Sequence, residues 1–124
     1  MNSPKVIVEK CRFSDSNYIR GEKKWAASQL IEWCKEKEYP IFNLPLAGIN
    51  MSGSPFTMSC FDTFVYHCKR MYEADLKHPI ILDDYGQICD GWHRVAKAIL
   101  AGKTTIPAIK IEVMPEPVGY EKRD

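Results

Sequence analysis

The chain has 124 residues, of which 45% are hydrophobic and 27% charged, and Lys plus Arg number 17 against 16 for Asp plus Glu. This composition is ordinary for one globular domain and excludes wholesale disorder. The near-neutral charge also argues against a general nucleic-acid binder, which carries a clear basic excess.

Two further absences narrow the class of protein. No apolar run approaches the roughly 18 residues of a membrane span, and the N-terminus lacks the apolar stretch of a signal peptide. The five cysteines form no Cys-x-x-Cys pair, so we expect reduced thiols rather than disulfides or a zinc site. We therefore expect a cytoplasmic protein without a membrane partner.

The first part of the chain predicts a strand, a loop, a helix and an extended segment. Residues 5–13 alternate valines with polar residues, which indicates a strand. Residues 14–23 are polar and rich in turn formers, which favours a loop. Residues 24–36 carry apolar positions at helical spacing, and Pro40 stops that helix. Residues 40–51 then predict an extended segment.

The middle of the chain predicts a loop and a second helix. Residues 52–58 contain the turn-forming residues of a loop. Ser59 followed by Asp62 resembles a helix start in which side chains satisfy free backbone N–H groups. Six apolar residues then recur at i, i+3, i+4 and i+7, and we interpret this stripe as core. They are Phe61, Phe64, Val65, Cys68, Met71 and Tyr72.

The last part predicts a hairpin, a short helix and a strand. Residues 79–82 and 87–90 flank "DDYG", which favours a β-hairpin with its turn at Gly86. Residues 92–101 predict a helix that Gly102 ends in the left-handed conformation.

Residues 106–113 alternate isoleucine and valine with charged residues, as in a half-buried strand, and residues 114–124 are expected to be a loose tail. The order of elements predicts an α+β fold, a single small domain over residues 1–124 with helices packed on one mixed β-sheet.

The first turn of the predicted 92–101 helix is the strongest candidate site. Helical spacing places His93, Arg94 and Lys97 together, on the side opposite the apolar residues. Three potential cations then lie beside the free N–H groups of a helix start, and Gly91 allows a close approach, so we expect a seat for an oxyanion. Asp90 would cap the helix, orient a neighbour or hold a metal beside a phosphate. The alternative is an ordinary turn and cap with a solvated basic face.

These residues also carry a resemblance to a known family. The stretch "PIILDDYGQICDGWHRVAKAILAGKTTIPAIKI" resembles the core of the ParB/sulfiredoxin superfamily, with a hairpin, an Asp-Gly-x-His-Arg turn into a helix, and an Ile-Pro strand. The match is best over residues 75–113, and residues 25–51 look like the helix and strand that precede this core in ParB-like proteins of phages and bacteria. Members include sulfiredoxins that use ATP, partition proteins that bind and hydrolyse CTP, and kinases of free serine.

The resemblance implies a nucleotide, ATP or another, with Mg²⁺. Gly91, His93 and Arg94 would contact its phosphates. Trp92 stands where sulfiredoxins carry their nucleophilic cysteine, so sulfinic-acid reduction is not expected. DNA partitioning is not expected either, since the Arg-rich turn, the helix-turn-helix and the dimerisation segment of partition proteins have no counterpart. The serine kinases share the Asp-Gly-x-His-Arg form and place a catalytic Glu on an upstream helix. The resemblance implies that Glu73 corresponds to this Glu, with Glu22 and Glu32 as alternatives.

The resulting hypothesis is a nucleotide-binding protein that, where active, is a phosphotransferase or nucleotide hydrolase. Arg94 and Lys97 would neutralise developing charge, Glu73 or Asp90 would be the base, and Asp90 would anchor the metal. His78 lies either near the nucleotide or at the surface. The acceptor is a small molecule or macromolecule that the sequence does not identify.

A non-catalytic phage- or plasmid-type module that keeps the fold and binds DNA or a protein is the alternative, and a nuclease would need a carboxylate cluster that the sequence does not place.

Four further residues have two interpretations each. Asp83 and Asp84 are turn residues at the hairpin tip or ligands for magnesium. Trp25, after two lysines, is a core residue or a stacking platform for a base. His67, on the second helix, is a structural residue or part of a site.

Overall fold

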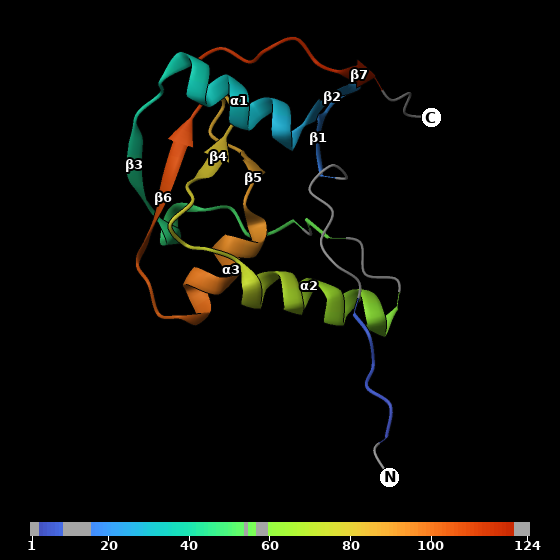
Figure 1. The fold of residues 1–124 in the computed structure, drawn as a ribbon. Coiled ribbons are helices and arrows are strands. Elements are labelled where there is room, and N and C mark those ends of the chain that lie inside the picture. Colours follow the sequence, from blue (N-terminus) through green and yellow to red (C-terminus); the bar gives the residue numbers. More distant parts are fainter. Residues whose placement is uncertain (1–2, 9–15, 54, 57–59, 121–124) are drawn as a thin grey trace.

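A computed structural model describes residues 3–8, 16–53, 55–56 and 60–120 of the chain (Figure 1). Two β-sheets, three α-helices and a short 3₁₀ helix make up these parts, so the fold is α+β as predicted. The strands are β1 (Asn17–Arg20), β2 (Lys23–Ala26), β3 (Ile41–Pro45), β4 (Ile80–Leu82), β5 (Ile88–Asp90), β6 (Thr105–Lys110) and β7 (Gly119–Tyr120). The helices are α1 (Ala27–Lys37), η2 (Leu46–Gly48), α2 (Phe61–Glu73) and α3 (Trp92–Leu100).

The larger sheet has the order β3-β6-β4-β5 and is mixed, as expected. β4 runs parallel to β6, whereas the β3–β6 and β4–β5 pairs are antiparallel. The predicted hairpin is confirmed: β4 and β5 pair, and Gly86 lies between them with a φ of +85°. The predicted helix end is confirmed as well, because Gly102 has a φ of +76° after α3.

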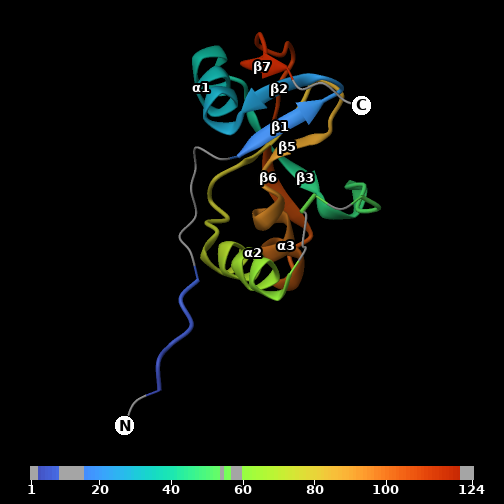
Figure 2. The ribbon, with the colours of Figure 1, turned by 90° about the vertical axis from the view of Figure 1, so that its right-hand side faces the viewer.

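Helices cover both faces of this sheet (Figures 1 and 2). Side chains alternate across a strand, so neighbouring residues of β4 enter different cores. Ile80 and Leu82 pack in the core with Val95 and Ala98 of α3. Ile81 packs in the other core, which α1 covers. That second core contains Trp25, Leu30, Cys34 and Ile111, and it is where burial raises the pKa of the Cys34 thiol to about 11.

A second sheet, of order β1-β2-β7, was not predicted. β1 and β2 form a hairpin inside the segment expected to be a loop, with Gly21 at a φ of +65° in the turn. Its strands are polar because, apart from Trp25, their side chains are exposed or only half-buried. Since β2 extends through Ala26, α1 begins at Ala27, three residues later than expected.

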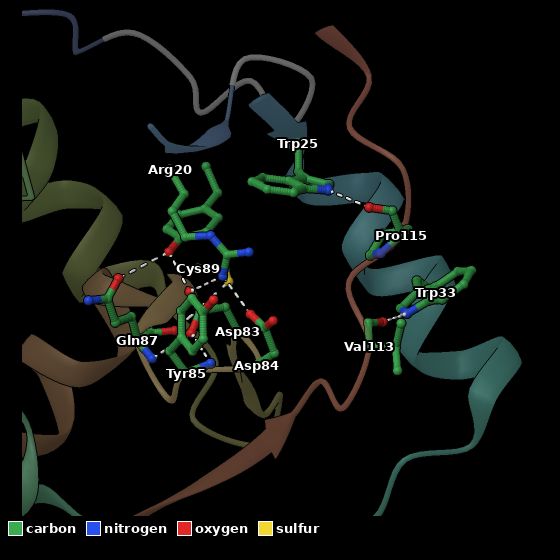
Figure 3. Close-up of polar contacts among 11 residues, drawn as sticks. Arg20, Trp25, Trp33, Asp83, Asp84, Tyr85, Gln87, Cys89, Val113 and Pro115 are labelled. Carbon is green, nitrogen blue, oxygen red and sulfur yellow. Dashed lines mark hydrogen bonds and ion pairs between the residues drawn. The ribbon is translucent and has the colours of Figure 1, made fainter. Parts of the chain in front are cut away.

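Two terminal expectations were wrong over the described residues. Residues 3–8 form no strand, and the rest of the expected 5–13 strand lies outside the described residues. The expected loose tail is instead tied to the body. Trp25 Nε1 donates to the Pro115 carbonyl at 2.8 Å, and Trp33 Nε1 donates at 2.8 Å to the carbonyl of Val113, the residue before the tail (Figure 3). β7 pairs with β2. The buried Trp25 is therefore a core residue and not a stacking platform.

The six apolar residues that recur at helical spacing after Asp62 lie on a helix, α2, as predicted, but they are not core. None of the 13 residues of α2 is buried. Cys60 precedes the helix without a side-chain cap hydrogen bond, and Ser59 of the expected start lies outside the described residues. The periodicity showed that one side of α2 is apolar, but it carried no information on what covers that side.

Candidate functional site

The turn from β5 into α3 has the backbone geometry that an anion site needs. Gly91 is the N-cap of α3 with a φ of +115°, and no acidic residue lies in the first turn of this fully described helix. The first N–H groups of a helix have no partner within it, and they carry positive partial charge. A Cβ on Gly91 would lie 2.5 Å from Cγ2 of the buried Ile80. Glycine is therefore required here both by its dihedral angle and by the space available.

Arg94 is committed to the protein itself. Its Nη1 donates to the carbonyls of His78 and Pro79 at 3.0 and 2.8 Å, and its Nη2 lies 2.7 Å from Oδ2 of Asp90. Its side chain is only 15% exposed. Three of the five guanidinium donors are therefore used, and Arg94 ties the start of β4 to the start of α3. The sequence-based expectation that Arg94 contacts phosphate did not include these internal partners.

Asp90 and His78 take part in the same arrangement. The Asp90 carboxylate is paired with Arg94 in an i,i+4 contact. The described residues include no group of three or more side chains suited to hold a metal ion. His78 contributes its carbonyl to Arg94, whereas its side chain is 74% exposed and lies 3.7 Å from Asp75.

Lys97 and Glu73 lie away from this turn. Lys97 Nζ donates to the carbonyls of Tyr72 and Ala74 at 2.9 and 2.6 Å, which satisfies the last turn of α2. The Glu73 carboxylate lies 3.7 Å from Lys69 Nζ. Glu73 and Lys97 line a hollow of about 690 Å³, together with residues 74–77 and residues from the start of β6. Neither Gly91 nor His93 lines that hollow.

The third expected cation, His93, forms a pair with His67. Nδ1 of His67 and Nε2 of His93 lie 2.9 Å apart, so one imidazole donates a hydrogen bond to the other. The ring of Phe56 stacks against both imidazoles, at centroid distances of 4.3 and 4.5 Å. The pair thus joins α2 to the first turn of α3.

Both imidazoles are neutral near pH 7. Burial, and then repulsion from Arg70, from His67 when it is protonated, and from Arg94, lower the pKa of His93 to about 4. Burial and the charge of Arg70 also lower the pKa of His67. The expected cluster of three cations is therefore not what the turn contains. Arg70, which sequence analysis did not single out, acts electrostatically on both histidines.

The spacing of His67 and Arg70 could have revealed this. Residues three apart on a helix share a face, and both belong to α2. The apolar spacing of this helix predicts a core position, which gives no reason to place its polar residues beside the 92–97 turn. Sequence alone also could not indicate that α2 and α3 lie side by side.

Trp92 borders a second hollow, of about 420 Å³. This hollow lies between the segment after β3 and the β4–β5 hairpin. Its lining is mainly apolar, and Asn50 and Gln87 contribute carboxamides. Trp92 itself is half-buried against the α3 core. A planar ring of a ligand bound in this hollow would lie next to Trp92 and therefore close to the Gly91 turn.

The hairpin tip is held by a network centred on the buried Asp83 (Figure 3). Tyr18 donates to Oδ2 of Asp83 at 2.7 Å, Arg20 binds both Asp83 and Asp84, and Oδ1 of Asp83 accepts the Tyr85 and Gln87 amides at 2.9 and 2.8 Å. Burial opposes ionisation of Asp83, but these hydrogen bonds outweigh it and lower the pKa of its carboxyl. Asp83 is a turn residue, as the first of its two interpretations held.

Comparison of the chain with models of known protein families, with curated proteins and with solved structures finds no match. Over the residues that the structure describes, none of the helices has both the length and the apolar character needed to cross a bilayer.

Proposed function

We propose that this chain binds the phosphate groups of a nucleotide at the N-terminus of α3. The observation that carries the proposal is the uncapped first turn of α3, which lies beside the His67–His93 pair and close to the charge of Arg70. Helix N-termini with a glycine at the turn bind phosphate through backbone N–H groups. The resemblance of residues 75–113 to the ParB/sulfiredoxin superfamily supports the same ligand class.

The roles in this proposal differ from those expected from the sequence. Backbone N–H groups of residues 92–94 and the side chain of Arg70 bind the phosphate, and Arg94 holds the turn in place through Asp90 and two carbonyls. The base occupies the hollow of about 420 Å³ beside Trp92, where Asn50 and Gln87 meet its polar edge. In this arrangement Arg70 binds the phosphate, whereas Arg94 positions the turn.

The described residues do not fit a protein-held Mg²⁺ at this turn. Asp90 is paired with Arg94, and no second carboxylate joins it in a metal-binding group among the described side chains. Glu73 lines the other hollow and is paired with Lys69, so it does not support the role of base at this turn. The proposal is therefore nucleotide binding, with phosphoryl transfer or hydrolysis left as the sequence-based prediction.

Calorimetric titration with ATP, ADP, CTP and GTP, with and without Mg²⁺, tests the proposal. A ligand that binds the folded state also raises the melting temperature by mass action, so thermal shift gives a second readout. Arg70→Gln should weaken binding by about 10-fold or more, the scale of a charge-assisted hydrogen bond.

Lys103→Gln is the matched control, because Lys103 lines the other hollow. It should leave nucleotide affinity unchanged. Loss of affinity in Lys103→Gln with no effect of Arg70→Gln would place the ligand in the hollow beside Glu73. No binding of any nucleotide would refute the proposal and favour the alternative, a non-catalytic module that binds DNA or a protein.

A further inference from the structure

One side of α2 is apolar and exposed. Phe61, Phe64 and Tyr72 are 77%, 47% and 80% exposed, and Phe61 and Phe64 stack on each other at 6.0 Å. Val65 and Cys68 continue the same stripe and are half-buried. We call these five residues the α2 stripe. Monomeric proteins seldom leave contiguous apolar patches uncovered, and such patches mark interaction sites.

Another side of α2 is already in contact with α3, and Lys69 donates to the carbonyl of Val8 at 3.3 Å. His67 contacts His93, and the carbonyl of Tyr72 accepts from Lys97. At 3.6 residues per turn, the α2 stripe lies roughly a third of a turn around the helix from His67. α2 also lies at the margin of the molecule, away from the two sheets (Figures 1 and 2). The stripe therefore faces outward, where a second molecule can reach it.

The charges of α2 favour one kind of partner. Asp62 and Lys69, seven residues apart, lie on one side of α2 at the edge of the stripe, with Asp62 in the first turn and Lys69 two turns later, whereas Arg70 lies on the side that carries His67 and faces His93. Two copies of α2 packed antiparallel would place opposite charges at each end and would also align their helix dipoles favourably. A parallel pair would bring like charges together. An antiparallel pair about a two-fold axis is self-complementary, so it closes as a dimer.

We propose that the α2 stripe is the interface of a homodimer in which α2 packs antiparallel on α2 of a second copy. The two-fold axis then lies near Val65 and Cys68, and Phe61 of one copy lies opposite Tyr72 of the other. A helix of 13 residues is only about 20 Å long. Its contact area is smaller than the roughly 800 Å² per partner of stable interfaces. The dimer is therefore one that dissociates on dilution, and it does not depend on nucleotide binding.

Sedimentation of the full chain at about 10 μM to 1 mM, a range around the affinity of small interfaces, tests the proposal. The apparent mass should rise from the 14.3 kDa of one chain toward twice that value. Phe64→Asp should raise the dimer dissociation constant by about 30-fold or more, because it places a charge in the centre of an apolar contact.

Val118→Asp is the matched control, because Val118 is 58% exposed but belongs to the segment before β7. It should leave the dimer intact. Circular dichroism of Phe64→Asp and of a second variant, Phe61→Asp, separates loss of the dimer from loss of the fold. Wild-type chain that stays monomeric at every concentration would overturn the proposal, and it would leave the stripe for another occupant, such as residues 3–8 of the same chain or a different protein.

Charge reversal tests the orientation. Asp62→Lys should weaken the dimer by about 5-fold, since each of the two symmetric contacts carries an exposed ion pair. Adding Lys69→Glu to Asp62→Lys exchanges the two charges that face each other across the proposed interface and should restore the dimer. Failure of the double variant to recover any affinity would overturn the antiparallel arrangement.

Discussion

His67 on α2 and His93 on α3 are joined by a hydrogen bond of 2.9 Å between Nδ1 and Nε2. One nitrogen must donate and the other accept, so the pair requires at least one neutral imidazole. Protonation of both rings removes the bond and places two positive charges beside Arg70. The contact between the two helices at the candidate site is therefore sensitive to pH.

The first prediction follows from the lowered pKa of His93. Between pH 6.5 and about 4 the unfolded chain binds a proton at His93 that the folded chain does not, so the free energy of unfolding should fall as pH falls through this range. The whole difference between the ordinary pKa of His93 and its pKa in the folded chain corresponds to a loss of up to ~3 kcal/mol in the free energy of unfolding. Urea denaturation at several pH values measures it.

His93→Gln should flatten this dependence. The comparison is between the slopes of the free energy of unfolding against pH in the wild-type and variant chains, and not between their absolute stabilities. His78→Gln is the control, because the side chain of His78 is exposed. The lowered pKa of Asp83 contributes stability above its usual pKa and loses it only at lower pH, so it does not mask the effect of His93. An unchanged slope in His93→Gln would contradict the prediction.

The second prediction concerns Gly91. Gly91→Ala should destabilise the fold by about 2–4 kcal/mol, because the left-handed dihedral costs roughly 1–2 kcal/mol and the added Cβ overlaps Ile80. Gly102 provides the comparison: it also has a positive φ, but nothing lies within 4 Å of its added Cβ. Gly102→Ala should therefore cost only about 1 kcal/mol. Equal losses in chemical denaturation would show that the contact with Ile80 is not what requires glycine.

The third prediction assigns Arg94 a positioning role. Arg94→Ala removes three hydrogen bonds and leaves the half-buried Asp90 unpaired, so we expect a loss of about 3 kcal/mol in the free energy of unfolding. Asp90→Asn,Arg94→Leu should recover part of that loss, because no unpaired charge remains. A fully stable Arg94→Ala protein would show instead that the guanidinium is free to bind a ligand.

The fourth prediction compares two adjacent aspartates. Asp83→Asn should cost about 3 kcal/mol or more, since the buried carboxylate satisfies Tyr18, Arg20 and two backbone amides. Asp84→Asn should cost less than ~1 kcal/mol, because the Asp84 side chain is partly exposed and binds Arg20 alone among the contacts described. Thermal melts of the two variants separate the effects, and similar melting temperatures would contradict this account.

Local patterns predicted the second half of the fold well. The hairpin at Gly86, α3 and its end at Gly102 each depend on residues close in sequence, whose turn and cap chemistry is specific. The β1–β2 hairpin was missed because its strands lie on a small exposed sheet and lack the apolar alternation that identifies strands. β7 was missed because its two residues pair only through tertiary contact with β2.

The turn from β5 into a helix at Gly91 was predicted, but the contacts of its side chains were not, and whether it is a functional site stays a prediction. The sequence predicted that residues 90–94 lie close together, because they are near one another in the chain. It could not show that Arg94 would turn back to the carbonyls of His78 and Pro79, or that His93 would meet His67. Those contacts depend on how β4 and α2 lie against α3, which is a property of the tertiary packing.

Trp25 and Pro115 are 90 residues apart, and their hydrogen bond, with β7, closes the smaller sheet over the core. A contact of that separation forms late in a folding reaction, because the entropy of closing so long a loop is lost before the contact stabilises anything. Until residues 113–120 dock, Nε1 of Trp25 does not have the carbonyl of Pro115 as its acceptor. During refolding of a variant in which Trp33 and Trp92 are replaced by phenylalanine, the fluorescence of Trp25 should therefore report the final step, after the hairpin and α3 have formed.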